Sequence, residues 1–260
     1  MVIVFAGPSL TGTGSAGPGV SLRPPARCGD VAAAVRERPA AIGLVDGLFE
    51  TAPSPWHKEL LWALSRGIAV YGAASMGAIR AAELLPFGMV GVGRVFELYR
   101  DGVIEDDDEV AVQHGPPELG YVHLSEAMVN VRATMAAAHR ASIVGEDVRD
   151  AVVHAAKSLF YKDRRWDLIL ERSGRDGASA EQLGRLRAWL PGNAVDLKRE
   201  DACALVARLA AAGARHSAPA SPAFQSTAYW KALERRLAPP SATAASARRR
   251  SRAPLAANPQ

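Results

Sequence analysis

The sequence predicts an α/β fold, with a parallel sheet flanked by helices in the N-terminal half and an all-helical C-terminal extension. Short apolar segments alternate with helical segments up to Leu85, whereas helical periodicity without convincing strands runs from Leu124 to about Ala212. We therefore expect an α/β core over residues 1–121, a helical extension over 122–213, and a largely disordered tail rich in Ala, Pro and Arg over 214–260.

The first strands end in residues that break regular structure. Val2 to Ala6 is an apolar run followed by Gly7-Pro8, which is typical of a buried strand that leads into a loop. A helix capped by Asp30 extends to about Arg38, and Ala41 to Val45 forms the next strand, which ends at Asp46-Gly47.

A glycine pattern lies between the first strand and this helix. Gly12-x-Gly14-x-x-Gly17 has the spacing of a dinucleotide-binding turn, but Pro18 follows where that turn needs a helix. A flexible loop is the favoured interpretation, and no cofactor is expected.

Two further helices and one strand complete the predicted core. Pro53 and Pro55 precede a helix from Trp56 to Ser65. Ile68 to Ala73 forms a strand, and a helix from Met76 to Leu85 follows at once. The alternation predicts a parallel sheet whose ligands bind beyond the carboxyl ends of the strands.

Composition and charge limit the class of protein. With 48% hydrophobic and 22% charged residues the 260-residue chain has the usage of a globular protein. It shows neither a membrane-spanning run nor a signal-peptide layout, so we expect a cytoplasmic protein without a membrane partner. Cys28 and Cys203 fit no zinc or disulfide pattern, and no metal site is expected.

The positive charge is concentrated near the C-terminus. Much of the net charge of +4 comes from Arg248, Arg249, Arg250 and Arg252, which lie in the predicted disordered tail. Nucleic-acid binding through this tail is one alternative function. Because the predicted folded part is nearly neutral, we expect no nucleic-acid partner.

Five motifs in the middle of the chain occur in an order that resembles the TfuA-like core. They are Pro55-Trp56-His57-Lys58-Glu59, Gly72-Ala73-Ala74-Ser75-Met76-Gly77-Ala78, Pro86-Phe87-Gly88-Met89, Glu105-Asp106-Asp107-Asp108-Glu109 and Leu124-Ser125-Glu126-Ala127-Met128. Gly7-Pro8-Ser9-Leu10 and Pro24-Pro25-Ala26 extend the resemblance toward the N-terminus, and it continues to about residue 134.

The resemblance implies a role in peptide backbone thioamidation beside a YcaO protein, on a precursor peptide or on methyl-coenzyme M reductase. In that partnership ATP and Mg2+ belong to YcaO, which activates the amide oxygen. The TfuA-like protein is expected to hydrolyse a thiocarboxylated ThiS-like carrier and so release sulfide. The alternative is a non-catalytic adaptor that recruits YcaO, carrier and peptide.

Ser75 is the candidate nucleophile because it lies in the turn between a buried strand and a helix, as in a nucleophile elbow. An N-cap of the helix is the alternative role for this serine. If Ser75 attacks a carbonyl, the amide groups of Met76 and Gly77 at the helix start are candidate oxyanion donors.

Several residues are candidates for the accompanying roles. His57, beside Glu59, is the preferred general base, with His114 after the apolar segment Val110 to Gln113 and Lys58 as alternatives. A surface histidine next to Trp56 is the competing interpretation of His57. Residues that follow strand ends or the serine are candidates for binding substrate or oxyanion, namely Ser9, Leu10, Asp46 and Arg80. Arg80 is also placed to form an ion pair with Glu83.

An acidic run precedes His114. Asp106, Asp107, Asp108 and Glu109 have three possible roles: docking a basic partner, binding Mg2+, or forming a solvated turn before a strand. Partner docking is the functional role that we favour for this run.

Overall fold

The computed structural model describes residues 1–11, 17–212 and 222–237. The chain divides into two compact units, Met1–Ala223 and Phe224–Gln260. The glycine pattern at 12–17 lies largely outside the described residues, as does the arginine cluster at 248–252.

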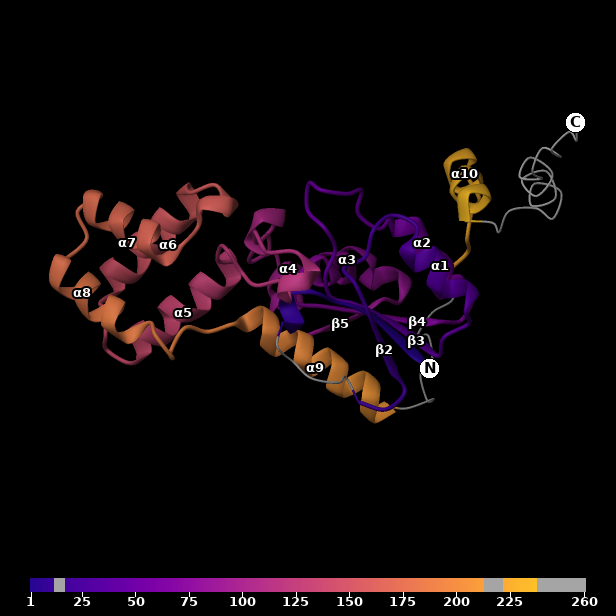
Figure 1. Ribbon diagram of the computed structural model, residues 1–260, viewed down its shortest axis with the longest axis horizontal. Coiled ribbons are helices and arrows are strands. Elements are labelled where there is room, and N and C mark those ends of the chain that lie inside the picture. Colours follow the sequence, from indigo (N-terminus) through magenta and orange to yellow (C-terminus); the bar gives the residue numbers. More distant parts are fainter. Residues whose placement is uncertain (12–16, 213–221, 238–260) are drawn as a thin grey trace, which may run out of the picture. The chain divides into compact units, whose positions relative to one another are not determined.

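The first unit contains a five-stranded parallel sheet, which confirms the predicted fold class (Figure 1). The strands are β1 (Val2–Phe5), β2 (Val20–Arg23), β3 (Ala41–Leu44), β4 (Ala69–Ala73) and β5 (Val90–Val92), in the order β2-β1-β3-β4-β5. In register, Val2 pairs with Ala41 of β3 and with Val20 of β2. Strands β2 and β5 are additions to the three that the sequence predicted.

The strand order creates a switch point at the carboxyl ends of β1 and β3. From β1 the chain moves outward to β2, and it then returns past β1 to β3 through α1 (Asp30–Arg36). The loops after β1 and β3 therefore diverge and leave a crevice between them, which is where α/β sheets bind ligands.

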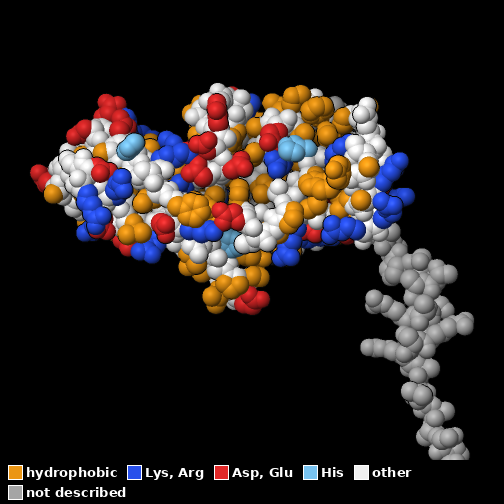
Figure 2. Space-filling view, turned by 90° about the horizontal axis from the view of Figure 1, so that it is seen from above, with side chains coloured by type: hydrophobic (Ala, Val, Ile, Leu, Met, Phe, Trp, Pro, Cys, Tyr) orange, Lys and Arg blue, Asp and Glu red, His pale blue; other side chains and the backbone are white. Residues whose placement is uncertain are grey.

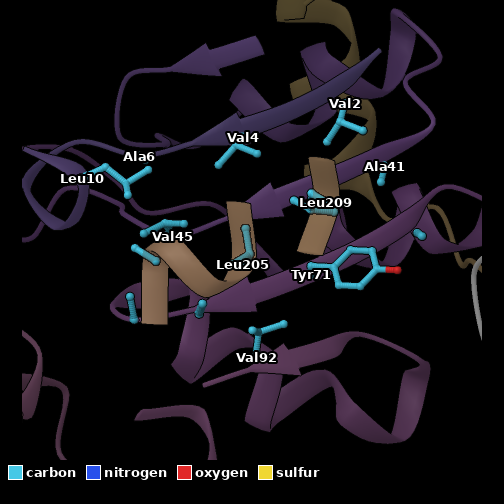
Figure 3. Packing of buried hydrophobic residues seen from close by; sticks show 14 residues of the cluster. Val2, Val4, Ala6, Leu10, Ala41, Val45, Tyr71, Val92, Leu205 and Leu209 are labelled. Atoms are coloured by element: carbon cyan, nitrogen blue, oxygen red, sulfur yellow. The ribbon is translucent and has the colours of Figure 1, made fainter. Parts of the chain in front are cut away.

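Helices cover both faces of this sheet. Besides α1, the chain forms α2 (His57–Ser65), α3 (Met76–Leu84) and α4 (Arg94–Arg100), and in Figure 1 α1, α2 and α3 lie on the opposite side of the sheet from α9 (Leu197–Ala212). The α9 face buries one hydrophobic cluster, in which Leu205 and Leu209 contact strand residues such as Val4 and Tyr71 (Figure 3).

Two glycines allow α3 to lie directly on the sheet. A Cβ atom at Gly77 would lie 1.8 Å from the carbonyl oxygen of Leu44, and one at Gly72 would lie 2.0 Å from the carbonyl oxygen of Gly77. The amide of Gly77 also donates to the carbonyl of Val45 at 3.0 Å. The start of α3 is thereby fixed against the ends of β3 and β4.

The predicted helical region is helical. It contains α5 (Met128–Arg140), α6 (Glu146–Ser158), α7 (Trp166–Arg175) and α8 (Ala180–Trp189), which share a hydrophobic core of their own. The last helix of the predicted extension, α9, packs on the sheet instead, so the extension is an excursion between α4 and α9.

The connecting segments contain short 3-10 helices. These are η1 (Pro8–Leu10), η2 (Leu85–Phe87), η3 (Asp107–Glu109), η4 (Pro117–Leu119) and η5 (Tyr161–Asp163). No strand follows the acidic run, so the alternative of a turn before a strand is not formed: residues 110–113 pair with no neighbouring strand. A single bridge joins His114 to His123 nearby.

The second unit contains α10 (Ala228–Leu237), which lies within the tail predicted from residue 214. Trp230 and Phe224 make an edge-to-face ring contact at 5.0 Å in this unit. Residues 214–221 and 238–260 of that tail lie outside the described residues. Among the helices that can be described, none combines the length and apolar character needed to cross a membrane.

Candidate functional site

A cavity of about 260 Å³ opens at the switch point, beyond the carboxyl ends of the strands. Its walls come from the loops after β1, β3 and β4, from the segment 110–114, from η5 and from the start of α9. The lining residues are Pro8, Asp46, Gly47, Phe49, Thr51, Ser75, Val110, Val112, Gln113, His114, Tyr161, Lys162 and Lys198.

Asp46 holds the loop after β1 in place. Its carboxylate accepts the amides of Gly7 at 2.8 Å and Ser9 at 3.0 Å, and the Ser9 hydroxyl at 2.7 Å. The Leu10 amide donates to the carbonyl of Gly7 at 3.0 Å. The Ser9 and Leu10 amides, two predicted oxyanion donors, are therefore already occupied by internal partners.

Ser75 lies in a strained turn between β4 and α3. Ala74 has a φ of +67°, and the Ser75 amide donates back to the carbonyl of Ala73 at 2.7 Å. A γ-turn with positive φ is rare and costly for a residue with a Cβ atom, and such strain clusters at functional sites. The turn brings Ser75 to the cavity wall.

The Ser75 hydroxyl is left available by its surroundings. Although Ser75 occupies the N-cap position of α3, its side chain makes no capping hydrogen bond. It also donates to no other side chain or carbonyl among the described residues. A serine at a helix start ordinarily satisfies a backbone amide of the first turn, so the lack of that bond favours a role other than capping.

One backbone donor next to Ser75 remains open. The Met76 amide has no hydrogen-bond partner among the residues that the structure describes, whereas the Gly77 amide is bound to Val45. Of the four amides considered as oxyanion donors, that of Met76 is therefore the one left available by the described residues. It lies at the N-terminus of α3, where the helix dipole favours negative charge.

Lys198, the second residue of α9, supplies a buried amine to the cavity. The residue is 1% exposed, and its Nζ donates to the carbonyl of Val110 at 2.6 Å. Burial lowers the pKa of Lys198, while the negative charges of Asp46 and Asp196 act in the opposite direction. The lowered pKa makes the neutral amine, a base, more accessible near physiological pH.

His114 lies in the same cavity wall as Ser75 and Lys198. Its Nδ1 lies 2.8 Å from the carbonyl oxygen of Gly115, which can only accept a hydrogen bond. Neutral His114 therefore carries its proton on Nδ1 and its lone pair on Nε2. An edge-to-face contact with Tyr121, at 5.5 Å between ring centres, restrains the imidazole ring.

Residues 46–165, which contribute most of this cavity, match the sequence model of a family described as TfuA-like protein. The chain carries a TfuA-like domain. No curated protein matches the chain. Asp46, Ser75 and His114 lie inside the TfuA-like domain, whereas Ser9 and Lys198 lie outside it on either side.

Another predicted group of the TfuA-like domain lies away from the cavity. His57 is exposed, and its Nε2 contacts Glu83 at 2.8 Å. Arg80 also pairs with Glu83, at 2.6 Å, and lines a separate hollow of about 140 Å³. Lys58 is half-buried in α2 and contributes nothing to the cavity lining. His57, Lys58 and Arg80 therefore do not line the cavity with Ser75.

Glu59 has a structural position. Its buried carboxylate accepts the amides of Gly29, Ala32 and Trp56 at 2.9 to 3.1 Å, so it caps the starts of α1 and α2. Burial raises the pKa of Glu59, and the three amides act in the opposite direction.

The acidic run forms an ion-pair cluster with α5, α6 and the segment before α7. Lys157 contacts Asp106 at 2.9 Å, Glu109 at 3.0 Å and also Asp108. Arg164 pairs with Asp108 at 2.8 Å, and Arg132 pairs with Glu109 at 2.8 Å. Asp107 is exposed. We call Asp106, Asp108, Glu109, Arg132, Lys157 and Arg164 the acidic cluster.

The charges of the acidic cluster are balanced internally. Burial alone would raise the pKa of Glu109, but its hydrogen bonds to Arg132 and Lys157 lower it overall. Over the described ranges, no three His, Cys, Asp or Glu side chains are grouped so as to hold a metal ion. Acidic and basic side chains are also interspersed on the face shown in Figure 2.

Sequence reasoning missed Lys198, although a signal for it exists. Residues 198, 202, 205 and 209 share one face of α9, and the last three are apolar residues in the core of the sheet. A lysine on the buried stripe of a helix is unusual, because its charge must be desolvated.

Proposed function

We propose that this protein hydrolyses the thiocarboxylate of a ThiS-like carrier and thereby supplies sulfide for YcaO-dependent thioamidation of a peptide backbone. The observation that carries the proposal is that Ser75 and Lys198 line one cavity: a serine hydroxyl with no hydrogen-bond partner among the described residues, and a buried amine. The sulfur-transfer setting rests on the TfuA-like domain, and ATP and Mg2+ would act on the YcaO partner.

The first step would transfer the acyl group of the carrier to Ser75. Neutral Lys198 accepts the proton of the Ser75 hydroxyl as its oxygen attacks the terminal carbonyl carbon. The C–S bond then breaks, the proton passes from the lysine to the sulfur, and HS⁻ leaves. The products of this step are the acyl ester of Ser75 and sulfide.

The second step would use water to regenerate the serine. Water attacks the ester, and Lys198 takes one of its protons and passes it to the Ser75 oxygen as the ester C–O bond breaks. The carrier leaves as a carboxylic acid, which gives its remaining proton to the solvent and becomes a carboxylate. In both steps the negative charge that develops on the carbonyl oxygen is stabilised by the Met76 amide and the positive end of α3.

His114 and Asp46 would support this chemistry in different ways. With its lone pair on Nε2, His114 is a second acceptor in the cavity wall, suited to orienting the attacking water. Asp46 shapes the wall by fixing the loop after β1, and its charge attracts the protonated form of Lys198.

The test is sulfide release from a thiocarboxylated carrier, with the Ser75→Ala, Lys198→Met and His57→Ala variants beside wild type. We expect Ser75→Ala and Lys198→Met to lower the rate by about 10³-fold or more. His57→Ala, the matched surface control, should retain the wild-type rate of sulfide release. Sulfide release that survives Ser75→Ala would exclude the serine mechanism.

The adaptor alternative makes a different prediction in a reconstituted thioamidation with YcaO and peptide. If the protein only supplies sulfide, added free sulfide should remove the need for it. If it joins YcaO, carrier and peptide, free sulfide should not replace it, and Ser75→Ala should remain active.

A further inference from the structure

We propose that Asn130 is a positioning residue whose side-chain amide fixes the start of α9 and thereby holds the amine of Lys198 in the cavity. The catalytic meaning of this inference rests on the proposed function. The positioning itself rests on contacts between α5 and α9 and can be measured without any substrate.

Asn130 bridges the two residues on either side of the first residue of α9. Its Nδ2 donates to the Asp196 carboxylate at 2.9 Å, and its Oδ1 accepts the Lys198 backbone amide at 3.2 Å. Asn130 is only 3% exposed, so both halves of its amide depend on these partners. One buried side chain thus fixes the backbone on which Lys198 is carried.

Asp196 extends this arrangement into the first turn of α9. The oxygen that accepts Asn130 also accepts the Arg199 amide at 3.1 Å, as an N-cap side chain does. Losing the Asn130 donor would free the Asp196 side chain as well. The start of α9 therefore depends on Asn130 through two consecutive contacts.

Lys198 has little else to hold its amine in place. Among the described residues its Nζ makes one hydrogen bond, to the carbonyl of Val110. The negative charges that act on its pKa are those of Asp46, after the end of β3, and Asp196. His114, Tyr161 and Lys162 are the other titratable side chains that line the cavity with it. Glu126 adds a further carboxylate near Asp196. A small movement of the first turn of α9 would move the amine relative to Ser75 and admit water.

Thr134 provides a matched control on the same helix. It lies one turn beyond Asn130 on α5, is 1% exposed, and accepts the Val195 amide at 2.9 Å. Thr134→Val removes the part-buried hydrogen bonds between this hydroxyl and the backbone of Val195, before α9, but leaves the Asn130 contacts with Asp196 and Lys198. A merely structural role predicts that the Asn130 and Thr134 variants behave alike.

The decisive measurement is the titration of Lys198 by NMR in full-length protein labelled with 13Cε-lysine. The chain has five lysines, and the resonance missing from Lys198→Met identifies the one of interest. We compare wild type with Asn130→Ala, Asn130→Asp and Thr134→Val. Asn130→Asp keeps the shape of the side chain and its acceptor oxygen, so it remains informative if Asn130→Ala fails to fold.

We expect the Lys198 midpoint to rise by about one pH unit in Asn130→Ala, because water reaches the amine. It should also rise in Asn130→Asp, which adds a carboxylate, and stay unchanged in Thr134→Val. The kcat/KM for sulfide release should fall about 10- to 100-fold in both Asn130 variants. Its pH profile should move with the Lys198 midpoint.

An unchanged midpoint in folded Asn130→Asp overturns the positioning role, as does an equal shift in Thr134→Val. The proposed function has a separate test, since sulfide release that survives Ser75→Ala contradicts the hydrolase and leaves the Lys198 titration unaffected. The two ideas can therefore fail independently.

Discussion

Two lysines lie in opposite electrostatic situations in this molecule. Lys157 of the acidic cluster contacts three carboxylates and is about one-third exposed. Lys198 of the cavity is buried, and among the described residues its amine bonds a backbone carbonyl and no carboxylate. The hydrogen bonds of Lys157 outweigh its partial desolvation and raise its pKa, but desolvation dominates at Lys198 and lowers its pKa.

The difference shows which charged group is available for chemistry. A lysine surrounded by carboxylates stays protonated, and its charge serves to join η3 to α6. A desolvated lysine whose amine bonds no carboxylate holds its proton less tightly than an exposed lysine, at a cost in stability. The acidic cluster therefore belongs to the scaffold, and the cavity is where reactivity is expected.

The largest effect should come from removing the buried amine. Lys198→Met should lower sulfide release by about 10³-fold, because the base is lost. The free energy of unfolding should be unchanged or higher, since an apolar side chain of similar length replaces a desolvated amine. Chemical denaturation and a sulfide assay check both parts, and a stable but still active variant would remove Lys198 from the mechanism.

The fit of α3 against the sheet is the next most sensitive feature. Gly77→Ala would place a methyl group 1.8 Å from the Leu44 carbonyl oxygen, which is rigid backbone. We expect the free energy of unfolding to fall by about 3 kcal/mol. Gly67→Ala is a poor control because of its positive φ, whereas Gly184→Ala adds a methyl group in open space on α8. Equal midpoints of chemical denaturation for Gly77→Ala and Gly184→Ala would contradict the close contact.

The pH dependence of activity should report Lys198. If the neutral amine is the base, kcat/KM rises about tenfold per pH unit below the Lys198 pKa and levels off above it. The inflection should lie below the ordinary lysine value of 10.5, because burial lowers this pKa. A stopped assay across pH with His114→Gln as control tests the assignment, since a histidine base would lose its inflection in that variant.

Replacing the paired lysine should give a smaller effect, on stability alone. Lys157→Met leaves Glu109 and Asp108 with one cation each, so we expect a loss of about 1 to 2 kcal/mol at neutral pH. Sulfide release should remain close to that of wild type. A large loss of activity in a folded Lys157→Met protein would show that the cluster contributes to function.

The acidic cluster should also affect how the stability of the protein changes as the pH falls. The pKa of Glu109 is lower in the folded chain than its ordinary value of 4.5, so its contribution to stability is present above that pH. That contribution is lost as pH falls through the folded pKa. The loss of stability on acidification should be smaller in Lys157→Met than in wild type, and thermal unfolding between pH 6 and 3 would measure it. Parallel curves of stability against pH for the two proteins would contradict this.

The sequence was sufficient for the fold class because the central strands are continuous apolar runs. It was insufficient for β2 and β5, since Val20–Arg23 is a half-exposed edge strand and Val90–Val92 is a three-residue strand with a central glycine. Helical periodicity also predicted α9, but it could not predict the surface against which α9 packs. Only the structure shows that Leu205 and Leu209 pack on strands.

Only the part of the candidate site that depends on one local turn could be predicted from the sequence. Ser75 and Met76 lie between a strand and a helix as expected, whereas the choice of base depends on distant segments. His57 begins α2 after a long loop and faces Glu83, so its nearness in sequence did not place it near Ser75. Lys198 reaches the cavity only because α9 returns to the sheet after four helices.

That return has a consequence for protein synthesis. A nascent chain that ends before α9 leaves the apolar side of the strands, including Val4 and Tyr71, without its covering helix. It also lacks the amine of Lys198, so the serine turn forms before the base that we propose is present. On the ribosome, burial of that sheet face and assembly of the reactive centre must therefore occur together, after translation has passed about two hundred codons.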